Sequence, residues 1–142
     1  MRNLIAAASL TLLAVTLDVS TATANPATTI KDATGASFTG DAAAGEKTFR
    51  QCAACHKLEA GKNGIGPSLN GVAGKKAASV AGYSYSGPMK KSGLTWNDQT
   101  LADYLENPRK VVPGTKMTFA GLRKPQDRAN VIAYMKKAGG GK

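Results

Sequence analysis

The pattern of apolar and polar residues predicts a helix that begins near Asp41 in this chain of 142 residues. The Asp41 carboxylate can cap the first free backbone amides of a helix. Gly45, Phe49, Cys52 and His56 then recur at intervals of four, three and four residues, which is the spacing of one helical face. We therefore expect one face of this helix to carry both core packing and chemistry.

Two further helices are predicted in the second half of the chain. Asn97 can cap the first of them, and Pro108 cannot continue it. The other begins at Pro125, a residue suited to the first helical position, and runs into the glycines at 139–141. Its apolar side includes Met135. Three main helices and no strand pattern indicate an all-α domain.

The remaining segments have no regular period. Residues 58–95 are rich in glycine, and residues 109–124 form a second irregular stretch. Loops this long are uncommon in compact domains unless they serve a function, so we expect them to line a cofactor. Residues 25–40, which are mostly small and polar, are predicted to be a flexible N-terminal arm. The folded domain is predicted over residues 41–138, followed by a short tail at 139–142.

The N-terminus has the pattern of a secretory signal peptide. A basic start precedes an apolar run from Leu4 to Leu17, and Ala22-Thr23-Ala24 fits a cleavage site. An uncleaved membrane anchor is the alternative, but the run is short for a membrane span and Asp18 interrupts its end. We predict that residues 1–24 are removed and that the protein is exported to the periplasm.

The composition of the chain bears on its cofactor and on the charge of its binding partner. Only 6% of the residues are aromatic and 16 are glycine, so the apolar filling is thin and a large apolar cofactor would complete it. The formal charge is +10, which predicts attraction to something acidic. Nucleic acid is a weak candidate because the chain has no stacking platform or reader motif and is predicted to be exported.

The segment from Cys52 to His56 matches the C-x-x-C-H pattern of covalent haem attachment. Two thiols three residues apart can reach the two vinyl groups of one porphyrin, while the adjacent imidazole reaches its iron. A disulfide between Cys52 and Cys55 would close a tiny loop of little stabilising value. A structural zinc site needs four ligands, and these three residues include every cysteine and histidine of the chain. A thioredoxin-like motif would need a βαβ setting.

The second axial position of such an iron cannot be filled by another histidine. Met89, Met117, Met135, a lysine or no protein group are the candidates. Met135 lies on the apolar stripe of the last helix, where core packing explains it. Met89 lies in the glycine-rich loop beside two lysines, where we expect it to be exposed. Met117 follows the tight turn at 113–116 and can project inward, so it is the expected ligand.

Six segments of the chain closely resemble the class I cytochromes c, and within them the mitochondrial-like cytochromes c2 of bacteria. They are Cys52 to His56, Gly66 to Gly71, Gly82 to Tyr85, Gly93 to Trp96, Tyr104 to Pro108, and Pro113 to Gly121. Together they span residues 41–137 nearly without gaps, which makes the resemblance more specific than any one motif. It implies a small all-α fold whose three main helices and long loops wrap around one covalently bound haem c.

The resemblance also implies roles for individual residues. Met117 would be the distal iron ligand, and the Pro67 carbonyl would accept the free ring N–H of His56. Tyr85 and Trp96 would donate hydrogen bonds to a haem propionate.

Other implied positions surround this site. Tyr104 and Thr115 would lie around the Met117 side of the haem, and Gly45 and Tyr134 would meet where the first and last helices cross. Two positions depart from the family pattern: Lys75 stands where an arginine near the propionate is common, and Met89 stands where asparagine is frequent.

The function implied is that of a soluble periplasmic electron carrier rather than an enzyme, in which a haem with both axial positions filled moves single electrons. A haem enzyme with an open distal side is the alternative. Acidic docking faces of a cytochrome bc1 complex, a terminal oxidase, a photosynthetic reaction centre or a periplasmic dehydrogenase are the expected partners. We expect a monomer with at most transient contact to a membrane surface. The basic residues expected around the haem edge are Lys57, Lys62, Lys90, Lys91, Arg109, Lys110, Lys116, Arg123 and Lys124.

Overall fold

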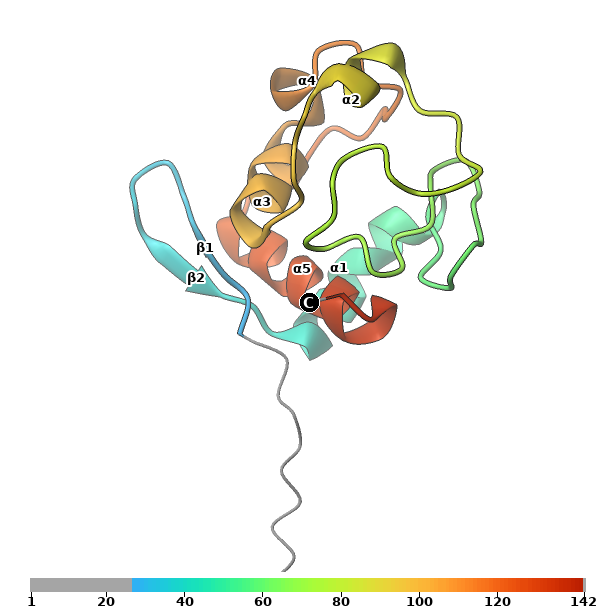
Figure 1. Ribbon diagram of the computed structural model, residues 1–142. Coiled ribbons are helices and arrows are strands. Elements are labelled where there is room, and N and C mark those ends of the chain that lie inside the picture. The colour runs from blue at the N-terminus through green and yellow to red at the C-terminus, as the bar shows by residue number, and fades with distance from the viewer. Residues whose placement is uncertain (1–26, 142) are drawn as a thin grey trace, which may run out of the picture.

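The computed structural model describes residues 27–141, so the predicted signal peptide lies outside the described residues. Its three longer helices are α1 (Ala42–Ala53), α3 (Asp98–Glu106) and α5 (Pro125–Gly139). Two short helices, α2 (Gly87–Lys91) and α4 (Pro108–Val111), and two strands, β1 (Thr29–Lys31) and β2 (Ser37–Thr39), complete the elements. In Figure 1 the long loop after α1 curls on the side of the molecule away from the two strands. Within residues 27–141 no helix has the length and apolarity needed to cross a membrane.

The helix boundaries follow the local signals of the sequence. Asp41 caps α1 by accepting from the Ala44 amide at 2.8 Å, and Asn97 caps α3 in the same way. Pro125 is the first residue of α5, as predicted. The prediction of one helical face through His56 is wrong, because α1 ends at Ala53, three residues before the imidazole.

Helices α1 and α5 cross at Gly45. A Cβ atom added to Gly45 would overlap the carbonyl oxygen of Asn130 and lie 2.8 Å from Cβ of Tyr134. The Phe49 and Tyr134 rings pack beside this crossing with their centroids 5.3 Å apart. The predicted meeting of Gly45 and Tyr134 is therefore confirmed, since only glycine lets the two backbones come this close.

The segment predicted to be a flexible arm is a β-hairpin. Strands β1 and β2 pair antiparallel, with Ile30 opposite Phe38. Ile30 is only 1% exposed and belongs to the hydrophobic core, so burial of this one apolar side chain outweighs the small and polar residues around it. The prediction of an unstructured arm is corrected over residues 29–39.

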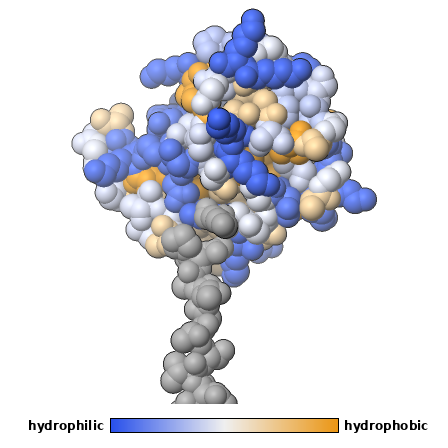
Figure 2. Space-filling model, in the orientation of Figure 1, coloured by the Kyte–Doolittle hydropathy of each residue, from blue (hydrophilic) through white to orange (hydrophobic). Residues whose placement is uncertain are grey.

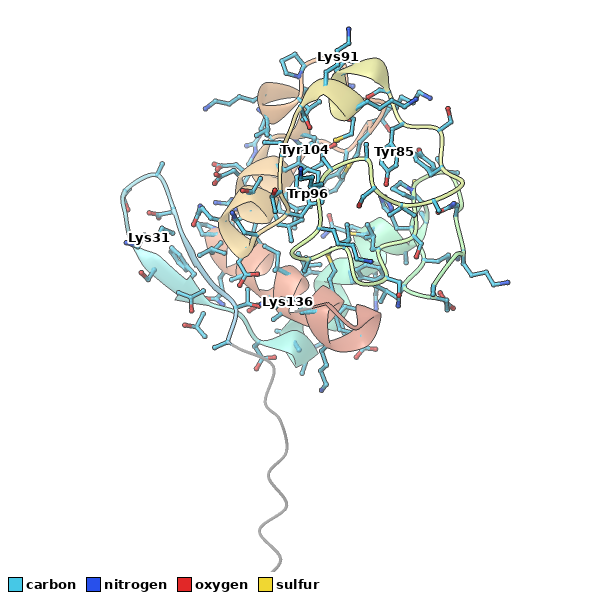
Figure 3. The ribbon with its side chains drawn as sticks, in the orientation of Figure 1. Lys31, Tyr85, Lys91, Trp96, Tyr104 and Lys136 are labelled. Carbon is cyan, nitrogen blue, oxygen red and sulfur yellow. The ribbon has the colours of Figure 1, made fainter. Side chains whose placement is uncertain are left out.

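Side-chain amides attach the hairpin to the helices. Gln99 of α3 accepts from the Lys31 amide at 2.8 Å and donates to the Lys31 carbonyl at 2.9 Å. Gln126 of α5 donates to the Thr39 carbonyl at 2.8 Å. Figure 1 shows the hairpin beside α3 and α5, and Figure 3 places Lys31 on it, far from Tyr85.

The core lies where α1, α3 and α5 meet. Val131 and Ile132 of α5 are completely buried, and Leu101 and Leu105 contribute from α3. An ion pair crosses the same interface, because the buried Lys136 on α5 lies 3.2 Å from the half-buried Asp98 carboxylate on α3.

Candidate functional site

The motif cysteines lie at the end of α1. Cys52 is the penultimate residue of the helix and Cys55 lies just beyond it, and both are half-buried with free thiols. The amides of Cys55 and His56 both donate to the Cys52 carbonyl, at 3.0 and 2.9 Å, so one turn holds the three residues together. Burial, with a smaller effect of neighbouring Cys55, raises the pKa of the Cys52 thiol to about 11. A protonated thiol of this kind does not suit thiolate redox chemistry.

The His56 ring is fixed from two sides. Its Nδ1 lies 2.7 Å from the Pro67 carbonyl oxygen, which can only accept, so Nδ1 carries the proton and Nε2 keeps a free lone pair. Burial lowers the pKa of His56, which favours this neutral form. A Cβ on Gly66 would overlap the imidazole, and the Gly66 amide donates to Cys55. The structure thus brings His56 and Pro67 together as the resemblance implied.

Met117 lies in the irregular segment before α5, and its side chain is half-buried. The Thr115 hydroxyl oxygen accepts from the Met117 amide at 3.3 Å and lies 3.0 Å from the Tyr104 hydroxyl. Burial raises the pKa of Tyr104, so its hydroxyl stays protonated at neutral pH. The structure therefore joins Tyr104, Thr115 and Met117 in one hydrogen-bonded group.

The other two candidate methionines are buried. Met135 packs in the core, as predicted. Met89 is only 7% exposed, which contradicts the expected exposure. Its amide donates to the Ser86 hydroxyl at the start of α2, and this short helix turns Met89 inward while its lysines stay outside. Of these three thioether side chains, only that of Met117 is half-buried.

The aromatic candidates occupy two regions of the interior. The rings of Trp96 and Tyr104 pack with their centroids 5.0 Å apart at the centre of Figure 3. Tyr85 lies on the long loop and packs edge-on against Tyr83 at 4.8 Å. Trp96 is only 7% exposed. Lys75 is exposed.

These side chains fit a haem. Half-buried apolar side chains from the end of α1 and from the long irregular segments pack against the core, as a large flat apolar ring requires; they include Cys52, Leu58, Leu69, Tyr85, Leu94, Met117 and Phe119. The donor set also matches, because two free thiols can add to vinyl groups while a neutral imidazole and a thioether are ligands that haem iron accepts. Residues 27–141 contain no cluster of three or more histidine, cysteine or acidic side chains suited to a bare metal ion.

A polar network that the residue pattern did not single out holds the loop that carries Pro67. Ser68 is 2% exposed, and its hydroxyl donates to the Glu59 carbonyl at 2.7 Å. Asn63 accepts from the Ser68 amide, and Asn70 donates to the Leu58 carbonyl. Serine and asparagine among glycines are typical of such loop bonds, which is the signal that could have identified them.

Comparison with known proteins agrees with this site. The family model described as "Cytochrome c" matches residues 42–139. Cytochrome c2 of Rhodoblastus acidophilus is 55% identical over 106 residues, covering 72% of this chain and 99% of that protein. Cytochrome c2 iso-2 of Magnetospirillum fulvum is 59% identical over 88 residues, covering 62% of this chain and 92% of that protein.

A solved structure extends the agreement to the fold. Cytochrome cH from Methylobacterium extorquens superposes with a TM-score of 0.66 at 52% sequence identity, covering 69% of this chain and 99% of that one. The prediction of a small cytochrome c fold around covalent haem c is confirmed. The chain therefore belongs to the cytochrome c family: it is a class I c-type cytochrome similar to the bacterial cytochromes c2, and it transfers electrons rather than acting as an enzyme.

Proposed function

We propose that His56 and Met117 bind the two faces of the haem iron, and that the protein carries single electrons between redox proteins in the periplasm. The observation that carries this proposal is the hydrogen-bonded group around Met117. The Thr115 hydroxyl accepts from the Met117 amide and lies within hydrogen-bond distance of the Tyr104 hydroxyl. The backbone that carries the Met117 thioether is therefore held in a fixed position. With both axial positions filled, no substrate could reach the metal.

The surrounding residues have separate tasks. The Pro67 carbonyl holds the imidazole in one orientation and one tautomer. The indole N–H of Trp96 and the hydroxyl of Tyr85 are donors suited to a propionate. The half-buried apolar side chains around the haem would keep water away from it, so little solvent needs to reorganise when the charge of the iron changes. The bound haem supplies an iron that exchanges one electron between its ferric and ferrous states.

The charge of the protein supports an acidic partner. Removal of residues 1–24 would take away one basic and one acidic residue, so the mature chain would keep the charge of +10. All nine basic residues predicted around the haem edge are exposed, and Figure 3 shows Lys91 of α2 pointing away from the molecule. Figure 2 shows hydrophilic side chains spread widely over one face, with apolar patches between them. Such a surface speeds encounters with the acidic face of an oxidase, a reductase or a reaction centre.

Carbon monoxide binding to the ferrous haem protein tests the axial ligands. The unchanged protein should ignore carbon monoxide, and Met117→Ala should bind it readily. Met89→Leu is the matched control, because it removes another buried thioether of the domain and should leave the protein unreactive. Equal reactivity of Met117→Ala and the unchanged protein would show that Met117 is not the ligand.

Three further measurements address location and partner. N-terminal sequencing of the periplasmic protein should begin at Asn25. The rate of electron transfer to an acidic partner should fall steeply with added salt, whereas a rate that ignores ionic strength would contradict electrostatic docking. A redox titration then narrows the choice among the respiratory and photosynthetic partners.

A further inference from the structure

Arg128 of α5 carries a charge in an unusual place. The residue is only 2% exposed, and its Nε has no hydrogen-bond partner within residues 27–141. Its Nη2 lies 3.6 Å from the carboxylate of Glu106, a side chain that is half in solvent. Burying a guanidinium with so weak an ion pair is costly, so the other contacts of Arg128 matter.

Those contacts are two backbone carbonyls in the segment that carries Met117. The Nη1 of Arg128 donates to the Leu122 carbonyl at 2.7 Å and to the Arg123 carbonyl at 3.0 Å. The Leu122 amide in turn donates to the Leu105 carbonyl at the end of α3, at 2.7 Å. Both backbone polar groups of Leu122 are therefore held, one by α3 and one by α5.

Packing rather than backbone hydrogen bonding holds the stretch between Met117 and Leu122: Phe119 is half-buried against the core, and Gly121 lies close to the Glu106 carbonyl. Within the described part of the chain, residues 118–121 make no backbone hydrogen bond to another backbone group. On the other side of Met117, the Thr115 hydroxyl and the Lys116 ammonium, which donates to the Ser84 carbonyl at 3.0 Å, provide separate anchors. A surface hollow of about 590 Å³ separates Ala120 from residues of α3 and α4, so the loop is not packed on that side.

We propose that Arg128 is a positioning residue for Met117. By holding the carbonyls of Leu122 and Arg123, it fixes the C-terminal end of the loop and so keeps the thioether at the iron. This inference rests on the proposed role of Met117 as the distal ligand. Arg128 does not itself touch the reacting group.

Imidazole binding to the ferric haem protein tests the proposal, because imidazole competes with Met117 for the iron. Arg128→Met keeps the length and burial of the side chain but removes both carbonyl bonds. It should lower the apparent dissociation constant for imidazole by at least about tenfold, equivalent to about 1.4 kcal/mol. Arg128→Lys, which keeps the charge but reaches the two carbonyls less well, should give an intermediate value.

Lys136→Met is the matched control for a merely structural effect. Lys136 lies on the same helix and is 5% exposed, and its substitution also removes an ion pair, but that pair is with Asp98 and not with the Met117 loop. Its imidazole affinity should stay within about twofold of the unchanged protein. Hydrogen exchange at the Leu122 amide should be faster in Arg128→Met and unchanged in Lys136→Met.

A second background separates this proposal from the proposed function. In Met117→Ala the Arg128→Met change should have no further effect on imidazole affinity. If Arg128→Met and Lys136→Met behave alike while Met117→Ala binds imidazole more tightly, the positioning role is wrong and the ligand assignment stands. If Met117→Ala itself leaves the affinity unchanged, the ligand assignment fails, and the positioning role fails with it.

Discussion

Substitution of Ile30 tests whether the N-terminal hairpin is part of the folded domain. Ile30→Ala removes a side chain that is 1% exposed and lies opposite Phe38 on the neighbouring strand. Truncation of a buried isoleucine to alanine costs about 2–5 kcal/mol, depending on how far the surroundings close the cavity. The two-stranded sheet can move toward α3 and α5 and partly close the cavity, which a helix packed inside the core cannot do as easily. We therefore expect a loss of about 2–3 kcal/mol in the free energy of unfolding.

The assay is denaturant unfolding of the mature haem-loaded protein, followed by far-UV circular dichroism. Thr29→Ala is the matched control, because Thr29 precedes Ile30 on the same strand but is exposed, and its change should stay within about 0.5 kcal/mol. Exchange of the Gly40 amide, which donates to the Thr28 carbonyl at the base of the hairpin, should speed up only in Ile30→Ala. Equal midpoints for the two variants would refute the packing argument.

Three other substitutions follow from close contacts. Gly45→Ala should destabilise the protein by about 2 kcal/mol, because the added methyl meets the backbone of α5, whereas Gly87→Ala on α2, with open space around it, should be neutral or slightly stabilising in the same unfolding assay. Gly66→Ala should lower the ratio of haem to protein in the purified product, since the methyl would displace the His56 ring; an unchanged ratio would contradict the packing of this ring. The carboxylate of Asp32 accepts from a hydroxyl and two amides of the hairpin turn, and the hydroxyl bond lowers the pKa of Asp32 below its ordinary value of 3.8. The stabilisation that the ionised carboxylate gives the turn is therefore complete above pH 3.8 and is lost as the pH falls through the lowered pKa. Nuclear magnetic resonance of the turn residues should show this loss, and the pH dependence should be absent in Asp32→Asn.

Local signals allowed the main helices to be predicted from the residues alone. A cap such as Asp41 or Asn97 acts within three residues, and a proline such as Pro108 or Pro125 limits its own neighbours, so neither depends on the rest of the fold. The haem motif is local in the same sense. The resemblance to a family added the positions that local rules do not reach, such as the Pro67 carbonyl beside His56.

The features that the sequence did not reveal depend on contacts across long stretches of chain. Nothing around Ile30 marks a strand, because the pairing of the Lys31 backbone with Gln99 joins residues 68 positions apart. Met89 lies between residues typical of an exposed loop, and it is buried because Ser86 starts a helix that turns it inward. The residues next to Ile30 and Met89 in the sequence therefore do not predict that either side chain is buried.

The residue pattern of α5 does not show which of its sides are buried, because polar residues lie on its buried sides. A helix buried on several sides is expected to be apolar all round, yet α5 buries Arg128, Asn130 and Lys136. Each of these polar side chains serves a different neighbour: Arg128 holds the loop after Met117, Asn130 accepts from the Asp41 amide, and Lys136 pairs with Asp98. Buried polar groups with defined partners restrict how neighbouring segments can dock, while apolar replacements would tolerate several arrangements. The polar residues that blur the amphipathic pattern of α5 are therefore the ones that fix α1, α3 and the Met117 loop around it.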